Sequence, residues 1–250
     1  MPRPRVQSLD RALDLLEALS GADELGVSEL AARTGLVPST AHRLLATLVA
    51  RGYAAQNPAT GRYLTGYKLL ELTSGLQDRL GRLRAAARPH LEAIQRETGE
   101  TTNLVVLEGR NAVYVDTVAG SRSVRLFIEV GQAIPAHTSG SGKALLAWRS
   151  PQDLAALFDG EPLAASTPRT LTALPALEAD LAQVRRQGYA IDDEEHELGV
   201  ACVATPVMDA AGQALAAISV TGPAPRIDPT ALAGLLRGHA QQVSAALKVG

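Results

Sequence analysis

The sequence predicts a mixed α+β protein with two folded parts joined by a helix. In residues 1–66, three segments with apolar residues at helical spacing precede two short strand candidates, which predicts a three-helix unit closed by a β-hairpin. In residues 87–250, strand and helix patterns alternate and predict an α/β domain with a mainly antiparallel sheet. Residues 67–86 carry a helical apolar series. With 250 residues, of which 46% are hydrophobic, the chain can build a core in each part.

The first part follows from helix signals. Ser8 is expected to cap the first helix and Ser28 the second, and Gly35 supplies the left-handed residue that ends the second. Pro38 fits the first turn of the third helix, which Gly52 ends. The first helix buries a stripe drawn from Leu9, Ala12, Leu13, Leu15, Leu16 and Leu19, and the third buries Ala41, Leu44, Leu45, Leu48 and Val49.

The hairpin is predicted from turn chemistry. Residues 53–56 and 62–64 are short strand candidates, and residues 57–61 between them form a turn-rich segment. A helix, a glycine turn, a second helix and a hairpin together describe a winged helix-turn-helix, in which the hairpin is the wing.

The opposite face of the third helix indicates nucleic-acid binding. That face offers Ser39, Thr40, His42, Arg43 and Thr47, which are short hydrogen-bonding side chains and one long cation suited to the major groove. No acidic residue occurs between Glu29 and Glu71, and the same stretch contains Arg33, Arg43, Arg51, Arg62 and Lys68. Arg62 on the wing is expected to touch phosphate. The alternative is a three-helix fragment with a solvated basic face and no nucleic acid.

Composition excludes several classes of protein. An aromatic content of 3% argues against binding single strands by base stacking, and no uncharged apolar run is long enough for a membrane span. The N-terminus lacks a signal sequence, so the protein is expected to be cytoplasmic. Because Cys202 is the lone cysteine, neither an intramolecular disulfide nor a multi-cysteine zinc site is expected, and no cofactor is predicted. Residues 2–5 could follow a DNA groove or form a disordered terminus.

The connecting helix is predicted from a leucine series, Leu69, Leu72, Leu76, Leu80 and Leu83. Gly75 and Gly81 weaken this helix and would permit bending. A second helix, with Pro89 in its first turn, is expected to begin the second domain and to end at Gly99.

The second domain is predicted to begin with an antiparallel meander. Its strand candidates are residues 104–107, 112–116 and 124–128, separated by turns at Gly109 and Gly120. Helices are expected at residues 143–148, 154–158, 174–187 and 229–247, with three more strands near Tyr189, Val200 and Ile218.

One glycine-rich segment invites a phosphate-loop reading that fails. Residues 140–143 read GSGK, but the full motif requires glycine at position 137 and serine or threonine at 144, where His137 and Ala144 stand. If Gly140 opens a helix, its exposed N–H groups favour a small anion such as a carboxylate. The alternative is a helix cap with glycine for close packing.

Other polar residues of this domain give weaker signals. Ser219 and Thr221 share one face of a strand candidate, and Cys202 lies on another, where each is either a ligand contact or a satisfied, half-buried residue. His137, His196 and Cys202 lack metal-ligand spacing. The acidic run 192–197 lacks a partnered nucleophile and reads as a solvated loop, and no Gly-x-Ser-x-Gly elbow surrounds Ser139 or Ser141. Enzymatic activity is therefore not expected.

Motifs along nearly the whole chain resemble those of IclR-type transcriptional regulators. In the first part these are residues 6–13 (VQSLDRAL), 30–36 (LAARTGL), Ser39-Thr40 with 43–45 (RLL), and 61–63 (GRY). In the second part they are residues 135–146 (PAHTSGSGKALL), 188–199 with Cys202, Ala204 and Pro206, and 217–223 (AISVTGP).

The resemblance implies a GAF-like effector-binding domain after the winged helix-turn-helix. It also implies an effector pocket lined by Asp192, Cys202, Ser219 and Thr221 with the Gly140-Ser141 turn, and an apolar wall that includes Leu126 and Ile134. It adds a homodimer and a possible homotetramer.

These observations predict a regulator that binds a palindromic operator in double-stranded DNA as a dimer and responds to a small organic acid or an aromatic metabolite. Two alternatives stay open. One is a small-molecule enzyme with a DNA-binding appendage, which ligand turnover would reveal. The other is an interaction module whose second domain only assembles subunits, which the lack of ligand-induced stabilisation would reveal.

Overall fold

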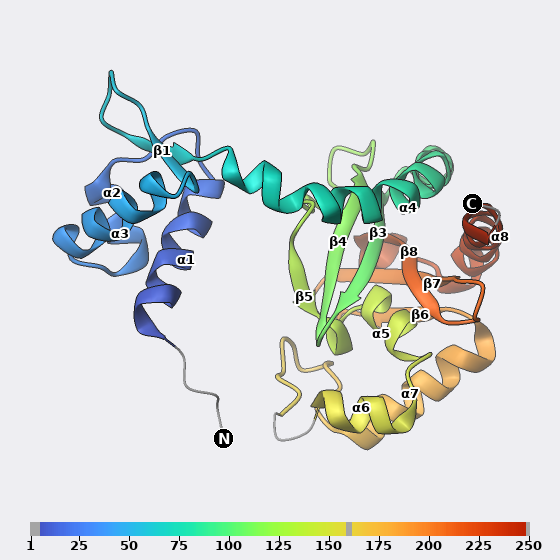
Figure 1. Ribbon diagram of the computed structural model, residues 1–250. Helices are drawn as coiled ribbons and strands as arrows, with labels where there is room; N and C mark the ends of the chain where they lie inside the picture. Colours follow the sequence, from blue (N-terminus) through green and yellow to red (C-terminus); the bar gives the residue numbers. More distant parts are fainter. Residues whose placement is uncertain (1–5, 159–161, 249–250) are drawn as a thin grey trace. The chain divides into compact units, whose positions relative to one another are not determined.

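The computed structural model describes residues 6–158 and 162–248, and the chain divides into two compact units, Met1–Arg79 and Leu80–Gly250 (Figure 1). The arm at residues 2–5 lies outside the described residues. The first unit contains the helices α1 (Gln7–Ser20), α2 (Val27–Thr34) and α3 (Pro38–Ala50) and the strands β1 (Ala54–Gln56) and β2 (Tyr63–Thr65).

The three helices of the first unit pack around one apolar core. Leu15 and Leu19 of α1, Leu30 of α2 and Leu45 of α3 are fully buried in it. Gly35 ends α2 in the left-handed conformation with φ 66°, as predicted. Other large apolar side chains of this unit, Val6, Leu9 and Leu13, stay exposed.

The capping predictions at Ser8 and Ser28 are wrong. Val6 and Gly26 occupy the N-cap positions, and both serines lie inside their helices. The start of α2 is stabilised from the other side of its first turn, because the Gly26 N–H donates to Glu29 Oε2 at 2.6 Å.

The hairpin is confirmed. Strands β1 and β2 pair antiparallel, with Gln56 opposite Tyr63, and an isolated bridge joins Leu25 to Tyr63. The buried ring of Tyr63 ties this hairpin to the helical core. The first unit is therefore a winged helix-turn-helix.

A single helix, α4 (Lys68–Thr98), replaces the two that the sequence predicts. The expected break at Pro89 is wrong, since Pro89 lies inside the helix. An interior proline removes one helical hydrogen bond and crowds the carbonyl four residues before it, which packing on both sides must offset. Leu83 before it and Leu91 and Ile94 after it are buried in one core, which holds both sides of the proline in a common helix.

The second unit contains a six-stranded sheet in which every neighbouring pair is antiparallel, as predicted. The strand order is β5-β4-β3-β8-β7-β6. The strands are β3 (Thr101–Glu108), β4 (Asn111–Val118), β5 (Ala133–Pro135), β6 (Ala190–Asp193), β7 (Val200–Met208) and β8 (Ala214–Pro223).

The predicted strand at residues 124–128 is wrong, because that segment is an irregular connection between β4 and β5. Side chains, not a neighbouring strand, bind its carbonyl groups. Arg226 Nη2 donates to the Val124 carbonyl at 2.8 Å, and Thr101 Oγ1 donates to the Leu126 carbonyl at 3.0 Å.

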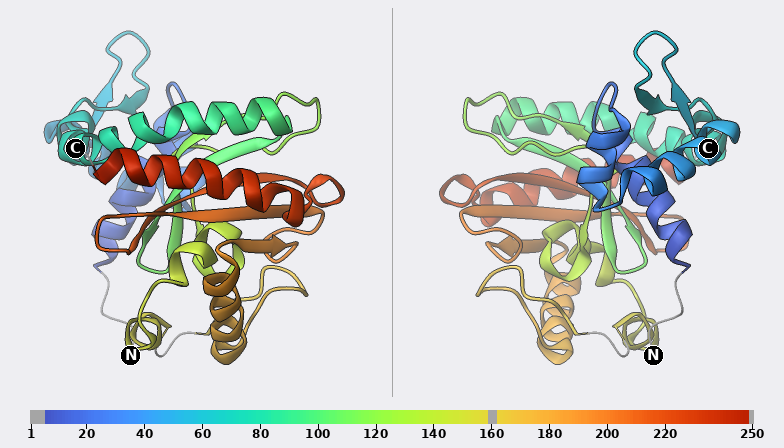
Figure 2. Two further views of the ribbon diagram at one scale, coloured as in Figure 1. Left: turned by 90° about the vertical axis from the view of Figure 1, so that its right-hand side faces the viewer. Right: turned by 90° about the vertical axis from the view of Figure 1, so that its left-hand side faces the viewer.

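Helices cover both faces of the sheet (Figures 1 and 2). The second half of α4 and α8 (Pro229–Lys248) pack on one face, around an apolar core that includes Val203, Ile218 and Val220. The other helices are α5 (Gly140–Leu146), α6 (Pro151–Phe158) and α7 (Leu174–Gln187), with short 3-10 helices at Ala136–Thr138 and Ala224–Arg226.

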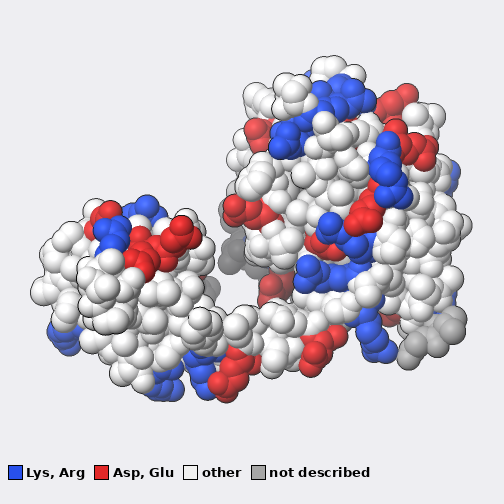
Figure 3. All heavy atoms as spheres, turned by 90° about the horizontal axis from the view of Figure 1, so that it is seen from above, with Lys and Arg blue, Asp and Glu red and all other residues white. Residues whose placement is uncertain are grey.

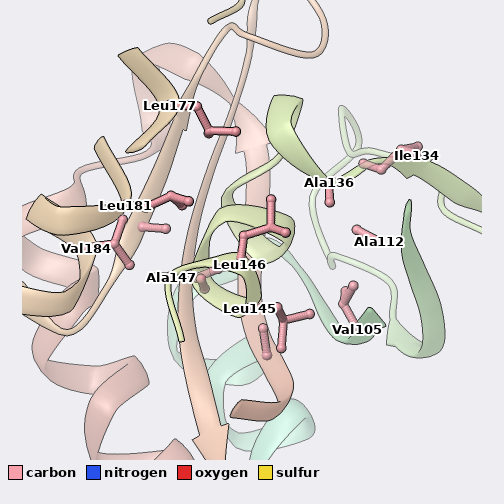
Figure 4. Packing of buried hydrophobic residues seen from close by; sticks show 14 of the residues in the cluster. Val105, Ala112, Ile134, Ala136, Leu145, Leu146, Ala147, Leu177, Leu181 and Val184 are labelled. Atoms are coloured by element: carbon pink, nitrogen blue, oxygen red, sulfur yellow. The ribbon is translucent and has the colours of Figure 1, made fainter. Parts of the chain in front are cut away.

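In the core on the second face, α5 packs against the sheet and α7 packs against α5. Figure 4 shows Leu145 and Leu146 of α5 between Val105 of β3 and Leu181 of α7. Within the described residues, no helix is both long and apolar enough to span a membrane.

Candidate functional site

The outward face of α3 carries the predicted DNA-reading side chains. Ser39, His42, Arg43 and Thr47 are exposed and Thr40 is half-buried. The Thr47 hydroxyl donates to the Arg43 carbonyl at 3.2 Å, which still leaves its oxygen able to accept. The buried stripe of Ala41, Leu45 and Leu48 fixes which face points outward.

Arg62 at the base of the wing already has protein partners. Its guanidinium donates to Glu29 Oε2 at 2.7 Å and to the Glu24 carbonyl at 3.2 Å. Figure 3 shows acidic and basic side chains next to each other on one face of the first unit. The sequence indicates a positive surface here, but the structure brings Glu24 and Glu29 beside Arg62 from before the acid-free stretch.

The effector residues predicted in the second unit gather on the sheet face that α5 covers. Across the strands, Asp192 of β6 lies opposite Cys202 of β7, and Cys202 opposite Thr221 of β8. One row further, Ser219 lies opposite Asn103 of β3. We call these five side chains the polar row; each is at most 6% exposed. Apolar residues such as Val203 and Val220 alternate with them and face the other way.

Gly140 and Ser141 at the start of α5 lie directly over the polar row. A Cβ atom on Gly140 would lie 3.1 Å from the Cys202 carbonyl oxygen, 3.2 Å from its sulfur and 3.3 Å from the Asp192 nitrogen. Ser141 is 2% exposed and lies beside Cys202. Glycine at position 140 therefore allows α5 to approach the row closely.

At the helix start, one of the N–H groups that we expected to face an anion already has a protein partner. The Gly142 N–H donates to Ser139 Oγ at 3.0 Å, so the helix caps itself. A Cβ on Gly142 would overlap the Ala136 backbone. Gly142 thus follows the alternative of a cap with close packing.

Leu126 and Ile134, the two predicted residues of the apolar wall, are placed differently relative to the polar row. Ile134 of β5 is buried in the same apolar cluster as Cys202. Leu126 is half-buried in the connection before β5, where its carbonyl binds Thr101, and Thr101 is the cross-strand partner of Thr221. Leu126 is therefore next to the end of the polar row.

Burial dominates the electrostatics of the row. It raises the pKa of Asp192 to about 7, opposed by backbone N–H groups of Glu195 and His196 that donate to Asp192 Oδ1. Burial also raises the pKa of the Cys202 thiol to about 11, with Asp192 adding to the rise. At neutral pH the thiol is protonated and Asp192 exists in both protonation states.

The acidic run 192–197 is only partly a solvated loop: Asp193 and Glu197 are exposed, as expected from the sequence, but Asp192 and Glu195 are not. Asp192 is buried, and Glu195 accepts from Lys143 Nζ at 2.6 Å. Lys143 is 1% exposed and also lies 3.2 Å from Asp180 Oδ2 of α7. The lysine of the GSGK segment therefore anchors the loop after β6. This role was not predicted from the sequence. A signal was present, because a lysine within an apolar helix pattern is seldom fully buried unless it is paired with an acidic group.

His137 and His196, which were weak candidates for metal ligands in the sequence, have hydrogen-bond partners within the protein. His137 Nε2 lies 3.0 Å from the Ala164 carbonyl oxygen, and His196 Nδ1 lies 3.1 Å from Thr138 Oγ1. Across the part of the chain that the structure describes, no three His, Cys, Asp or Glu side chains are grouped so as to hold a metal ion.

Sequence reasoning missed two further residues of the site. Asn103 is fully buried and hydrogen-bonds to both Ser219 and Thr221. Tyr114 of β4 is buried on the same face, and burial, then Cys202 and Asp192, raise the pKa of its phenol. Both residues stand within strand patterns, and only the register of the strands brings them to the row.

Family models match both units. The model for the IclR helix-turn-helix domain matches residues 8–58, and the model for the C-terminal part of the bacterial transcriptional regulator IclR matches residues 79–245. The regulator XynR of Escherichia coli is 38% identical over 245 residues, which cover 98% of this chain and 96% of XynR. The regulator BhcR of Paracoccus denitrificans is 39% identical over 230 residues, covering 92% and 82% of the two chains.

Solved structures agree over the full length. IclR of Thermotoga maritima superimposes with a TM-score of 0.76 at 30% identity, covering 97% of this chain and 99% of that one. An IclR homologue from Microbacterium hydrocarbonoxydans, solved with 4-hydroxybenzoate, gives 0.80 at 28% identity, covering 97% and 100%. Such relatives are named as regulators, not enzymes. With a winged helix-turn-helix, an α/β effector-binding domain and family models that match most of its length, the chain belongs to the IclR family of bacterial transcriptional regulators.

Proposed function

We propose that this regulator binds a palindromic operator as a homodimer and that a small carboxylic acid, aliphatic or aromatic, bound at the polar row changes its affinity for that operator. The observation that carries the ligand site is the convergence of three hydroxyls, a thiol and a carboxyl on one buried patch. Buried polar groups are costly unless they are satisfied, so a patch this dense favours a role in ligand binding.

The acid class follows from the hydrogen-bonding groups. Ser141, Ser219 and Thr221 can donate O–H groups, and Asp192 in its protonated form adds one more donor. Donors that converge favour a ligand rich in acceptor oxygens, and a carboxylate presents two acceptor oxygens and no donor. The Microbacterium homologue solved with 4-hydroxybenzoate supports this class. Ile134 and Leu126 would contact the apolar part of the ligand.

On the DNA side, we propose that α3 lies in the major groove, with Ser39, Thr40, His42, Arg43 and Thr47 facing the bases. Arg43 would read a guanine edge. Arg43→Ala should then lose about 1–3 kcal/mol on the operator and less on random DNA. Arg51→Ala is the matched control, since Arg51 is an exposed arginine at the other end of α3.

Dimer formation is supported by apolar side chains that neither unit buries. Leu9 and Leu13 of α1 and Leu72 and Leu76 of α4 are between 44% and 59% exposed. A two-fold dimer would present its helix-turn-helix units to half-sites one or more helical turns apart. Light scattering should give a dimer, or a tetramer if the second units also associate, whereas a monomer at micromolar concentration would contradict this part of the proposal.

The test of the whole proposal is operator binding measured by fluorescence anisotropy with and without small carboxylic acids. An acid that shifts operator affinity must bind one state of the protein more tightly than the other. We expect at least one acid to shift the affinity and to be recovered unchanged. Stabilisation of the protein by acids with no effect on DNA binding would contradict the regulatory role.

A further inference from the structure

Asn103 is the one member of the polar row that carries two N–H donors. It is fully buried on β3, and its Nδ2 lies 3.2 Å from Ser219 Oγ and 3.2 Å from Thr221 Oγ1. Its other amide atom, Oδ1, accepts from the Thr117 hydroxyl of β4 at 3.1 Å. Every hydrogen-bonding atom of the amide group therefore has a neighbour on an adjacent strand.

The direction of these bonds determines where the hydroxyl hydrogens of Ser219 and Thr221 point. A hydroxyl has one hydrogen and two acceptor lone pairs. Because Asn103 donates to both oxygens, each hydroxyl uses a lone pair toward Asn103 and keeps its hydrogen for another acceptor. Both hydroxyls lie beside Cys202, whose sulfur is on the side of the row that faces Gly140.

We propose that Asn103 is the positioning residue that sets the specificity of the effector site, because it makes Ser219 and Thr221 donors and so selects a carboxylate over its neutral amide. This inference rests on the proposed function and adds to it the reason why the site prefers an acid. A carboxylate oxygen only accepts, so it matches two hydroxyls that present their hydrogens. The NH₂ group of an amide is itself a donor, so it cannot accept a hydrogen bond from either hydroxyl.

An aspartate at position 103 reverses the arrangement at almost constant volume. Its carboxylate can only accept, so Ser219 and Thr221 would turn their hydrogens toward it and present lone pairs to the ligand. Asn103→Leu also keeps the volume but removes both donors, which leaves the hydroxyls free to turn either way. The two variants therefore separate the direction of the hydrogen bonds from the packing.

The experiment measures affinities of the full-length protein by calorimetry for two matched pairs, 4-hydroxybenzoate with 4-hydroxybenzamide and lactate with lactamide. In the wild type we expect a preference of about tenfold or more for the acid of a pair that binds. Asn103→Asp should abolish or reverse this preference, and Asn103→Leu should reduce it to about threefold or less. Asn111→Asp is the matched control, an exposed asparagine of β4, and should change the affinity less than about twofold.

A merely structural role for Asn103 is tested in a second background. If Asn103 acts through the two hydroxyls, then in Ser219→Ala with Thr221→Val the further change Asn103→Leu should leave the acid-to-amide ratio unchanged. A ratio that still shifts by the single-variant factor would overturn the proposal. So would an Asn103→Asp variant that folds and keeps the preference for the acid, and so would equal wild-type binding of acid and amide.

The outcomes also separate this inference from the proposed function. If the wild type binds an acid that alters operator affinity but does not distinguish it from its amide, only the role of Asn103 fails. If neither pair binds the wild type at millimolar concentration, the acid class fails, and the role of Asn103 fails with it. If Asn103→Asp does not fold, Asn103→Leu alone decides, because an unchanged ratio in that variant contradicts the proposal.

Discussion

The outward face of α3 and the polar row of the second unit are both built from hydrogen-bonding side chains. They differ in burial and in how many of their hydrogen bonds are made within the protein. On α3, Ser39, His42 and Arg43 are exposed and point away from the core. In the polar row, Asn103 and Ser219 are fully buried and bonded to each other. An exposed group competes with water for its partner, whereas a buried group has its hydrogens assigned in advance.

Because of this difference in burial, mutations in the two regions should affect different properties of the protein. Changes on α3 should alter DNA binding and its salt dependence with little effect on folding. Changes in the row should alter ligand binding, pH dependence and stability together, because the same hydrogen bonds serve the fold.

The largest expected effect is on stability, at the glycine that lets α5 dock. Gly142→Ala should destabilise the protein by about 3 kcal/mol or more, since its Cβ would overlap the Ala136 backbone and α5 would have to move away from the 3-10 helix that precedes it. Urea unfolding measures this. Gly234→Ala in α8 is the control, because open space surrounds it and alanine favours helix, so stability should rise by up to about 1 kcal/mol. Equal effects at both positions would show that α5 does not need this close approach.

The next effect should appear in ligand binding. Ser219→Ala with Thr221→Val should weaken binding of an active acid by about 1–3 kcal/mol, because two donors are lost. It should also lower stability by about 1–2 kcal/mol, since the Asn103 amide loses its acceptors. Operator affinity without ligand should stay close to that of the wild type. Unchanged ligand affinity measured by calorimetry would contradict the site, and a collapse of operator affinity would make the two residues purely structural.

A smaller effect is the pH dependence of acid binding through Asp192. Its pKa is raised to about 7, mainly by burial, so the carboxyl donates to a ligand carboxylate below that pH and repels it above. The affinity should fall by up to about tenfold per pH unit above 7, and Asp192→Asn should remove this dependence. The titratable groups facing Asp192 are Tyr114, Lys143, Glu195, His196 and Cys202.

Beside Asp192, with its pKa of about 7, burial also raises the pKa of Glu195, and Lys143 opposes that rise. Burial raises the pKa of Cys202 to about 11 and lowers that of His196, so the thiol is protonated and the imidazole is neutral at pH 7. The stability of the fold should change with pH in the same direction as acid binding. Because the folded state raises the pKa of Asp192, its contribution to stability is greatest at low pH and is lost as the pH rises through about 7. A wild-type affinity that is flat between pH 6 and 8 would contradict this role for Asp192.

The sequence was sufficient for the first unit because its signals are local. Pro38 opens α3 and Gly35 ends α2 as predicted, and the apolar stripe decides which side chains face outward. The failures are local too. Ser8 and Ser28 looked like caps, but each lies two residues after the N-cap position. At the second helix it is Glu29, not a serine, that supplies the oxygen for the Gly26 N–H.

The polar row depends on strand register, which a single sequence does not contain. Ser219 and Thr221 could be assigned to one face by alternation, but Asn103 joins them only because β3 pairs with β8 in that register. For the same reason the pattern at residues 124–128 suggested a strand, although no strand pairs with that segment. The acidic run 192–197 looked solvated because its buried partner, Lys143, is about fifty residues away in sequence.

The smallest expected effect is on DNA binding, at Arg62. This residue resembles the polar row because the protein already supplies its partner. Arg62 is a half-buried basic residue that the fold has already paired, with Glu29 at 2.7 Å. To bind phosphate it must exchange this partner, and exposed ion pairs contribute only about 0–1 kcal/mol. Arg62→Ala should therefore weaken operator and random DNA alike, by about 1 kcal/mol or less, and reduce the slope of log affinity against log salt by about one unit.

Glu29→Gln provides the matched variant for Arg62, since a glutamine oxygen can still accept from the Gly26 N–H that starts α2. With its carboxylate partner removed, Arg62 is free to bind phosphate, and we expect about two- to threefold tighter binding to both DNAs at low salt. Fluorescence anisotropy over a salt series measures both variants. If Arg62→Ala left the salt slope unchanged and Glu29→Gln did not strengthen binding, Arg62 would serve only to hold the wing against α2.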